Sequence, residues 1–276
     1  MLLIAGATGN VGGELVHALL RAGEPVRALT HTDRDSSLPP DVERATGDLN
    51  DPESLTTALN GVRAIFLLSG YADMPGLLTK IRDAGVRHVV LLSSGAVDGG
   101  DLANVVVRYH AAAEAAVKDA GLPWTILRPS GFHSNALRWL PQLRSGNVVR
   151  EPFADVPVAG IDPFDIAAVA ALALTRPGHD HAIYRLTGPE AVLPADRIRI
   201  LARLLGRDLR LQPLSDDEAR AELGATMPSE YVDAFFNFFV DGAYDDAVVL
   251  PTTSELLGRP ARTFRQWAEA HADAFR

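Results

Sequence analysis

The segment Leu2-Leu3-Ile4-Ala5-Gly6-Ala7-Thr8-Gly9-Asn10-Val11-Gly12 carries the clearest evidence for the fold. The apolar run over residues 2–5 predicts a buried strand, and three glycines spaced three apart follow it at once. Apolar residues then recur at helical spacing as far as Gly23, which predicts a helix immediately after the glycine turn. This pattern therefore predicts one strand–turn–helix unit at the N-terminus.

Each glycine of this turn has a distinct use. Gly6 permits the tight turn, Gly9 lets the backbone approach a pyrophosphate, and Gly12 lets the helix lie close to the strand. The helix N-terminus offers free N–H groups and a positive dipole to phosphates. We therefore expect a dinucleotide here; the alternative is a glycine turn with no ligand. The predicted contacts of this loop are Gly6, Thr8, Gly9, Asn10, Val11 and Gly12.

Short apolar runs alternate with helical patterns through the first 150 residues. Strands this apolar are buried on both faces, as in a parallel sheet that helices cover. The alternation predicts an α/β fold, a Rossmann doubly wound parallel sheet. The expected strands are 2–5, 26–29, 42–46, 64–68, 89–92 and 124–127, and the expected helices are 11–22, 52–60, 77–84 and 105–120.

The second half of the chain is less regular. We predict an NAD(P)-binding domain over residues 1–150 and a smaller α+β substrate-binding lobe over 151–276, with parts of the chain crossing between the two. No Gly/Ser linker separates them, so we expect them to pack as one unit. The expected helices here are 162–175, 195–205, 229–240 and 263–275, and the expected strands are 183–186 and 209–212.

Composition excludes several classes of protein. The 276 residues carry a net charge of −9 and no Lys/Arg run, which argues against binding to nucleic acid or to anionic membranes. With no cysteine, the chain has no disulfide, thiolate zinc site or cysteine nucleophile. No apolar run reaches the roughly 20 residues that a membrane helix needs, and no signal peptide is evident. We expect a cytoplasmic protein.

The segment after the second strand bears on the choice of nucleotide. It reads Leu29-Thr30-His31-Thr32-Asp33-Arg34, and no acid directly follows the strand. A carboxylate there would bind ribose hydroxyls, whereas cations suit a 2′-phosphate. Because His31 and Arg34 can face such a phosphate, the sequence favours NADP(H) over NAD(H). The alternative is that Arg34 is solvated and Asp33 binds the ribose.

Further cofactor contacts are expected where later strands end. Asp48 follows the third strand and can accept a hydrogen bond from the adenine amino group; the alternative is a turn aspartate. Leu49 follows Asp48, and Leu68 and Ser69 stand at the end of the fourth strand. Ligands of doubly wound sheets bind at the carboxyl ends of the strands, so we include these residues in the site.

The chain resembles the NmrA-like group of atypical short-chain dehydrogenases/reductases, and within it the reductases of quinones, azo compounds and triphenylmethane dyes. This resemblance implies a Rossmann domain, a small C-terminal substrate lobe with a cleft between them, and NADP(H). It rests on residues 6–12, Gly47-Asp48-Leu49, Leu91-Leu92-Ser93-Ser94-Gly95, His110-x-x-x-Glu114, residues 121–129, Leu186-Thr187-Gly188-Pro189 and residues 258–264.

The resemblance also exposes a break in the catalytic pattern. Ordinary members carry Tyr-x-x-x-Lys, with the tyrosine as proton donor, and a glutamate four residues after the lysine. Aligning that glutamate with Glu114 puts His110 at the lysine position and Val106 at the tyrosine position. Tyr109 is adjacent to His110, but one residue turns a helix by about 100°. We therefore expect Tyr109 to point elsewhere.

A protein without this pair suits an acceptor that needs little acid help, such as a quinone, an azo compound or a cationic dye. The proton then comes from water or from His110, since an unperturbed histidine has a pKa near ~6.5. Ser93 and Ser94 end the fifth strand, where either hydroxyl contacts nicotinamide or substrate, or merely satisfies backbone. The candidate catalytic residues are His110 and Ser94, and the candidate cofactor contacts include Ser93 and His110.

Two other activities stay open: an NADP-binding redox sensor without turnover, and a biosynthetic reductase or epimerase. In each enzyme hypothesis the partner is a planar or aromatic small molecule, and the protein is a monomer or homodimer. His179-Asp180-His181 is interpreted as a loop, with no metal site, because no third ligand is evident. Four phenylalanines between residues 235 and 239 predict core packing or, alternatively, a flat apolar acceptor site.

Overall fold

The computed structural model describes residues 1–30 and 38–276. A seven-stranded sheet has the order β3-β2-β1-β4-β5-β6-β8, and neighbouring strands from β3 through β6 pair in parallel. The strand order reverses between β1 and β4, which confirms the predicted doubly wound sheet. Its strands are β1 (Leu2–Ile4), β2 (Val26–Thr30), β3 (Glu43–Thr46), β4 (Ala64–Leu68), β5 (Val89–Leu92), β6 (Trp124–Pro129) and β8 (Ala182–Leu186).

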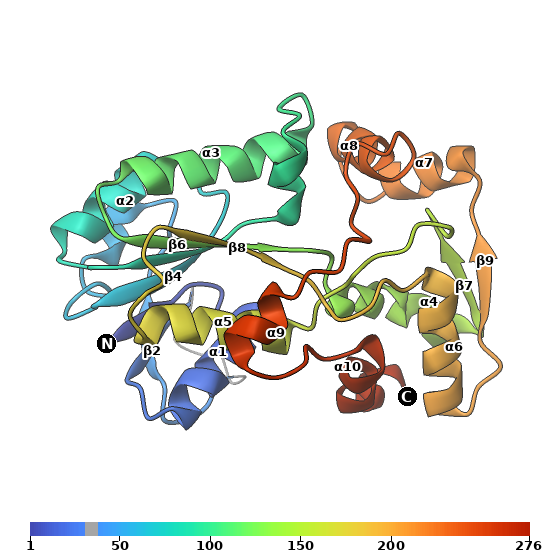
Figure 1. The fold of residues 1–276 in the computed structure, drawn as a ribbon, viewed down its shortest axis with the longest axis horizontal. Coiled ribbons are helices and arrows are strands. Elements are labelled where there is room, and N and C mark those ends of the chain that lie inside the picture. Colours follow the sequence, from blue (N-terminus) through green and yellow to red (C-terminus); the bar gives the residue numbers. More distant parts are fainter. Residues whose placement is uncertain (31–37) are drawn as a thin grey trace. The chain divides into compact units, whose positions relative to one another are not determined.

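Helices cover both faces of this sheet. Figure 1 shows α2 (Met74–Asp83) and α3 (Val105–Asp119) on one face and α1 (Asn10–Arg21) and α5 (Pro163–Thr175) on the other. The central strands β1, β4 and β5 are buried except for the last residues of β4 and β5, as their apolar sequences predict. The predicted end of the first helix is also confirmed, because Gly23 has φ +73°, the left-handed conformation that ends α1.

One predicted helix is wrong. Residues 52–60 do not form a regular helix; only Pro52–Leu55 form a short 3₁₀-helix, and turns follow. Asp51 makes no side-chain cap. The hydroxyl of Ser54 donates to the backbone carbonyls of Asp48 and Asp51, at 3.1 and 2.7 Å. Such local bonds compete with helix formation, which propensity alone does not reveal.

The remaining elements include a two-stranded parallel sheet. That sheet pairs β7 (Val148–Glu151) with β9 (Arg210–Pro213), and β7 was not predicted. The predicted helix 263–275 is interrupted at His271, whose ring bonds the carbonyl of Trp267 at 2.8 Å. The helices here are α4 (Leu140–Ser145), α6 (Pro194–Leu205), α7 (Asp216–Gly224), α8 (Ser229–Phe239), α9 (Thr252–Leu257) and α10 (Phe264–Ala270), with 3₁₀-helices at Gly95–Gly99, His133–Trp139 and Ala272–Phe275.

The chain forms two compact units that are discontinuous in sequence. The first contains Met1–Ser94, Tyr109–Pro129 and Pro163–Arg185, and the second contains Gly95–Arg108, Ser130–Asp162 and Leu186–Arg276. The sequence predicts a single domain boundary at residue 150, and α5 and β8 both follow that boundary along the chain. In the structure, however, α5 packs against α1, and β8 joins the sheet beside β6. All of α5 and most of β8 therefore belong to the first unit. No helix in the described part of the chain is long and apolar enough to cross a bilayer.

Candidate functional site

The glycine turn has the geometry that its spacing predicts. Gly6 has φ +62°, and the amide of Gly9 donates to the carbonyl of Gly6 at 2.9 Å. A Cβ on Gly12 would lie 2.1 Å from the Gly6 oxygen, so only glycine lets α1 approach β1 this closely. Gly9 precedes α1 and makes no side-chain cap, so the first amides of the helix lack an intrahelical partner. Such a turn fits a pyrophosphate.

The loop residues differ in what they can offer a ligand. Thr8, Gly9 and Asn10 are exposed, whereas Val11 and Gly12 are buried. The side chain of Val11 belongs to the core, so its predicted cofactor contact is confined to its backbone amide.

A cavity of about 370 Å³ opens beside this turn, where β1, β2, β3 and β4 end. It brings together five of the predicted contacts, namely Gly6, Thr8, Asp48, Leu49 and Leu68. Its other lining residues are Leu29, Thr30, Gly47, Asn50 and Tyr71, which the sequence analysis missed although each lies in or near a strand end. The predicted His31 and Arg34 lie outside the described residues.

Two polar residues organise the loops around this cavity. The carboxylate of Asp48 accepts from the backbone amide of Asn50 at 2.8 Å, so Asp48 is a turn aspartate that also lines the cavity. The side-chain oxygen of Asn50 accepts from the amide of Ala72 at 2.9 Å and joins the loop after β3 to the loop after β4. Burial raises the pKa of Tyr71 to about 12, so this phenol is a neutral donor at the cavity wall.

Ser93 takes part in a buried ionic cluster. Its hydroxyl donates to the carboxylate of Glu114 at 2.7 Å, and Arg128 donates to the same carboxylate through two nitrogens, at 2.8 and 2.6 Å. Burial alone would raise the pKa of Glu114, but these hydrogen bonds outweigh it and hold that pKa below its ordinary value. Among protein groups, the partner of the Ser93 hydroxyl is thus a carboxylate and not the backbone at the strand end. Half-buried Ser94 follows at the carboxyl end of β5.

His110 and Tyr109 lie on α3 as predicted, but their surroundings differ from expectation. Burial lowers the pKa of His110 to about 4, so the imidazole is neutral near pH 7 and is a poor general acid. Its Nδ1 is buried without a partner. Tyr109 does not point away: its hydroxyl donates to the carbonyl of Ser69 at 2.6 Å, and its ring covers Gly70. The hydroxyl of Ser69 in turn donates to the carbonyl of Leu92 at 3.0 Å.

The second unit contains a larger cavity, of about 580 Å³. Of the four clustered phenylalanines, Phe236 and Phe238 are buried, as core packing predicts, whereas Phe235 and Phe239 line the cavity. Phe153 lines it too and has φ +54°, which is rare for an aromatic residue. Its ring packs against Phe236 and Phe239, at 5.1 and 5.2 Å between ring centroids. The tertiary packing of the cavity wall thus holds Phe153 in this conformation.

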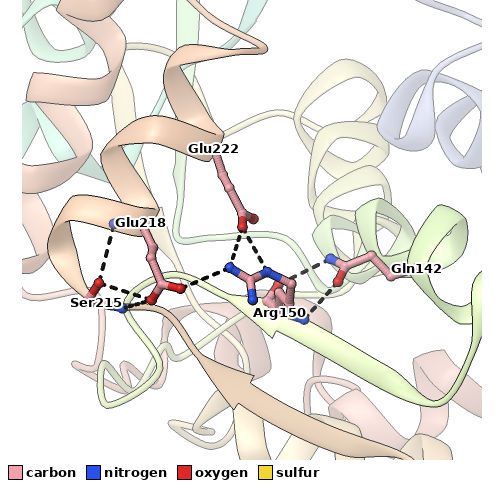
Figure 2. Close-up of polar contacts among 5 residues, drawn as sticks. All are labelled: Gln142, Arg150, Ser215, Glu218 and Glu222. Carbon is pink, nitrogen blue, oxygen red and sulfur yellow. Dashed lines mark hydrogen bonds and ion pairs between the residues drawn. The ribbon is translucent and has the colours of Figure 1, made fainter.

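Most charges at this cavity are matched in pairs. Arg150 donates to Glu222 at 2.8 Å and to Glu218 at 3.2 Å (Figure 2). Ser215 caps α7 and fixes Glu218 through a reciprocal capping box. Gln142 exchanges two hydrogen bonds with the backbone of Arg150, which anchors β7 to α4. A linear reading of the sequence does not show these pairs, because their members lie far apart along the chain.

The described residues contain no cluster of three or more histidine and carboxylate side chains able to hold a metal ion. His179 instead bonds the hydroxyl of Tyr184 at 2.8 Å, and His181 packs edge-on against Trp124. These two histidines therefore have structural roles in the loop before β8.

Comparison with known proteins agrees with this geometry. A family described as NAD(P)H-binding matches residues 6–177. The chain is 43% identical to the (4-alkanoyl-5-oxo-2,5-dihydrofuran-3-yl)methyl phosphate reductase of Streptomyces griseus subsp. griseus, over all of this chain and 99% of that protein. It is 34% identical to the NAD(P)H azoreductase of Xenophilus azovorans, over 100% and 99% of the two chains.

The fold is shared with solved structures. The NADPH-dependent quinone oxidoreductase of Escherichia coli superposes with a TM-score of 0.81 at 24% identity, covering 100% of both chains. That agreement concerns the fold alone, whereas the family match and the two full-length relatives establish the family and the general activity. The chain belongs to the NAD(P)H-binding, NmrA-like family of atypical short-chain dehydrogenases/reductases and is an NAD(P)H-dependent reductase.

Proposed function

We propose that this reductase uses NADPH to reduce a small conjugated acceptor, and that no protein side chain serves as its general acid. The proposal is supported by the residues that α3 carries at the two catalytic positions of the family and by the pKa of His110. Val106 and His110 stand at the Tyr and Lys positions of the family pattern, and burial lowers the pKa of His110 to about 4. At these two positions α3 therefore presents no protonated group of suitable acidity at neutral pH.

The residues at the first cavity fit a dinucleotide. The amides at the start of α1 hold the pyrophosphate, and the close packing at Gly12 keeps those amides in place. Leu49 and Leu68 offer apolar walls to the adenosine half, and Asp48 accepts from its polar edge. The proposed preference for NADPH over NADH rests on the sequence. No acid directly follows β2, and His31 and Arg34 are the cations in the segment after it.

The acceptor class follows from the missing acid. Bound NADPH supplies a hydride, and an acceptor must then stabilise the resulting negative charge by conjugation until water protonates it. Quinones, azo groups and carbon–carbon double bonds conjugated to carbonyls satisfy this requirement, whereas isolated ketones do not. The chain's own contribution is to position the reactants and to exclude bulk water.

Within this class, the relative at 43% identity favours a conjugated alkene. The substrate in its name is an unsaturated lactone whose double bond is conjugated to both the ring carbonyl and the alkanoyl group. A reductase of an acylated unsaturated lactone, acting in biosynthesis, is therefore the second candidate. The azoreductase at 34% identity supports the broader class.

A panel assay tests the proposal. Purified protein is mixed with NADPH or NADH and with a quinone, an azo dye, an acyl-substituted unsaturated lactone or a simple saturated ketone, and loss of nicotinamide absorbance is followed. We expect faster turnover with NADPH, reduction of at least one conjugated acceptor, and none of the ketone. Efficient ketone reduction would contradict the missing acid, and binding of NADPH without any turnover would favour the redox-sensor alternative.

Two variants sharpen the assay. His110→Ala removes the candidate proton source, and Tyr109→Phe removes the hydroxyl that bonds the carbonyl of Ser69. If water protonates the product, kcat for the best acceptor falls by less than about tenfold in either variant, because a positioned general acid contributes about 10²–10⁴-fold. A loss of a hundredfold or more in one variant would identify that residue as the acid.

A further inference from the structure

The geometry points to an anion-binding subsite at the cavity of the second unit, formed by Arg197 and Ser134, which selects acceptors that carry a phosphate or carboxylate group on an apolar body. This inference rests on the proposed function, since it names the class of acceptor that the reductase takes. Its evidence is the pairing of charges around the cavity, the unpartnered polar atoms of these two residues and the apolar wall beside them.

Arg197 is a buried cation without a counter-ion. It lies on α6, lines the cavity and is only 8% exposed. Its one protein hydrogen bond runs from Nη2 to the carbonyl of Val158 at 3.3 Å, and its Nε is buried with no partner. Burial lowers the pKa of Arg197 to about 10, which still leaves it charged at neutral pH. A buried charge is costly unless an anion or several acceptors compensate it.

The two acidic side chains that attract Arg197 electrostatically, Glu151 and Asp246, are engaged elsewhere. Glu151 attracts Arg197 electrostatically, but its carboxylate accepts from Arg138 and from the indole nitrogen of Trp139, the latter at 2.7 Å. Glu151 is 2% exposed, so these two donors define its position in the core. It therefore offsets part of the charge of Arg197 without forming an ion pair with it.

The other carboxylates of the cavity are likewise bonded to other groups. Asp246 accepts from the amide of Gly131 at 3.0 Å and from the hydroxyl of Tyr244 at 2.9 Å. Glu222 accepts from Arg150, as Figure 2 shows. Among the cations that line this cavity in the described chain, Arg138 and Arg150 each have a carboxylate partner. Arg197 is thus the cation that a ligand's negative charge would match.

Ser134 is a second unpartnered group at the same cavity. It lies in the 3₁₀-helix His133–Trp139 and is 6% exposed, and its Oγ is buried without a hydrogen bond. Leaving a buried hydroxyl unpaired costs free energy, and an anion oxygen is an acceptor that it can use. A guanidinium and a hydroxyl together are donors typical of phosphate and carboxylate sites.

The other residues that line this cavity favour a ligand with an apolar body. A volume of about 580 Å³ lies in the range of small-molecule pockets. Aliphatic and aromatic side chains make up much of the lining, so a purely inorganic anion would leave this surface in water. The apolar members are Phe153, Val156, Val158, Leu214, Leu223, Met227, Phe235 and Phe239.

A purely structural role for Arg197 is the competing explanation, because its guanidinium lies 5.7 Å from the ring centroid of Phe264. Kinetics with matched acceptors separate the two roles. One conjugated core is prepared with a neutral hydroxymethyl group, with its phosphate ester and with a carboxylate. We expect the charged forms to have a lower KM in the wild-type protein, by roughly tenfold to a hundredfold, the range for hydrogen bonds to charged groups.

Variants then assign the effect to its residues. Arg197→Gln removes the preference for the charged forms, Arg197→Lys keeps part of it, and Ser134→Ala weakens it. Arg150→Gln is the matched control: it removes a cation of the same cavity that is already paired, so the preference stays. If Arg197→Gln retains the full preference, or if Arg150→Gln loses it, the inference fails. Thermal unfolding of each variant shows that it is folded.

The acceptor arms also separate two kinds of anion. A lower KM for the phosphate ester than for the carboxylate indicates a site for a dianion, and equal KM values indicate recognition of charge alone. If the wild type reduces the neutral core but shows no preference for either anion, the anion subsite fails while the proposed function stands.

Binding without turnover keeps the two proposals apart. If no form of the core is reduced, the proposed function fails, and calorimetric titration of the saturated, phosphorylated core onto wild type and Arg197→Gln decides the inference independently. Binding that Arg197→Gln weakens at least tenfold supports the subsite. Equal binding by both proteins, or binding by neither, overturns it.

Discussion

Gly12 is a residue whose identity follows directly from steric exclusion. A Cβ there would lie 2.1 Å from the carbonyl oxygen of Gly6, whereas a Cβ on neighbouring Gly13 would have its nearest contact at 3.6 Å, an ordinary van der Waals distance. The two glycines share a helix and differ by one position, so they form a natural comparison. The first sets the distance between α1 and β1, and the second does not.

Replacing Gly12 with alanine is expected to destabilise the protein by about 1–3 kcal/mol, the usual cost of forcing extra atoms into a packed region. It also weakens NADPH binding, because α1 and its amides move. Gly13→Ala is expected to be neutral or to stabilise the helix by up to about 1 kcal/mol. Urea unfolding and titration with NADPH measure both effects. Equal behaviour of the two variants would contradict the packing argument.

Buried histidines predict how stability depends on pH. Burial lowers the pKa of His110 to about 4 and that of His133 to about 3. Between pH 6.5 and 4 the unfolded chain therefore binds more protons than the native state, so stability falls as the pH falls. Each group contributes up to about 1.4 kcal/mol per pH unit in that window.

The His133→Leu variant tests this pH dependence, because it removes one of these groups at a fully buried position. Relative to wild type, the free energy of unfolding of this variant is expected to decline less between pH 6.5 and 4. His17→Gln, a change at an exposed position on α1, should leave the decline as it is. Parallel curves for wild type and His133→Leu would show that His133 titrates in the native state as it does in the unfolded chain.

At the scale of secondary-structure elements, Glu114 joins three pieces of the first unit. It lies on α3, accepts from Ser93 just beyond β5, and holds Arg128 of β6 through two hydrogen bonds. The carboxylate is 1% exposed, so both partners meet it out of water. Lys118 also contacts Glu114, at 3.2 Å, but its side chain is 36% exposed.

Replacing Glu114 with glutamine removes the negative charge to which Arg128 donates two hydrogen bonds in a buried setting. We expect the free energy of unfolding to fall by about 3 kcal/mol, as when one partner of a buried ion pair is removed. Lys118→Gln removes an outer cation of the same cluster and should cost less than about 1 kcal/mol. Urea unfolding measures both variants. A small cost for Glu114→Gln would show that the cluster contributes little to holding α3 on the sheet.

Elements built from local signals are those that the sequence predicts well. Apolar runs located β4 and β5 to the residue, and the glycine spacing located the cofactor turn, because both depend on neighbours along the chain. The helix 52–60 failed because the hydroxyl of Ser54 competes for the backbone. The bond from Tyr109 to Ser69 and the unpartnered Nε of Arg197 do not follow from the sequence, because they depend on residues distant along the chain.

At the scale of the whole molecule, the chain enters each compact unit three times. Residues Pro163–Arg185 return to the first unit after the chain has visited the second, and they supply α5 and most of β8. Apolar residues of α5 such as Ile166 and Val169 are fully or almost fully buried. The nucleotide-binding unit is therefore incomplete until the chain has passed residue 185.

Truncation tests this organisation. A fragment of residues 1–150 lacks α5 and β8 and leaves the surface that they cover exposed to water, so we expect no cooperative unfolding and no binding of NADPH. A fragment of residues 1–185 contains every segment of the first unit and is expected to recover both properties. Calorimetry and NADPH titration compare the two. Full NADPH affinity in the 1–150 fragment would show that α5 is dispensable.

We propose that this protein transfers hydride directly from NADPH to a conjugated acceptor. Single-turnover oxidation of NADPH, with deuterium placed in turn on each face of nicotinamide C4, tests it most directly. We predict that a conjugated acceptor accelerates oxidation of the bound nucleotide and that deuterium slows the reaction on one face only. Oxidation at the same rate with either label, or no acceleration by any acceptor, would contradict the account.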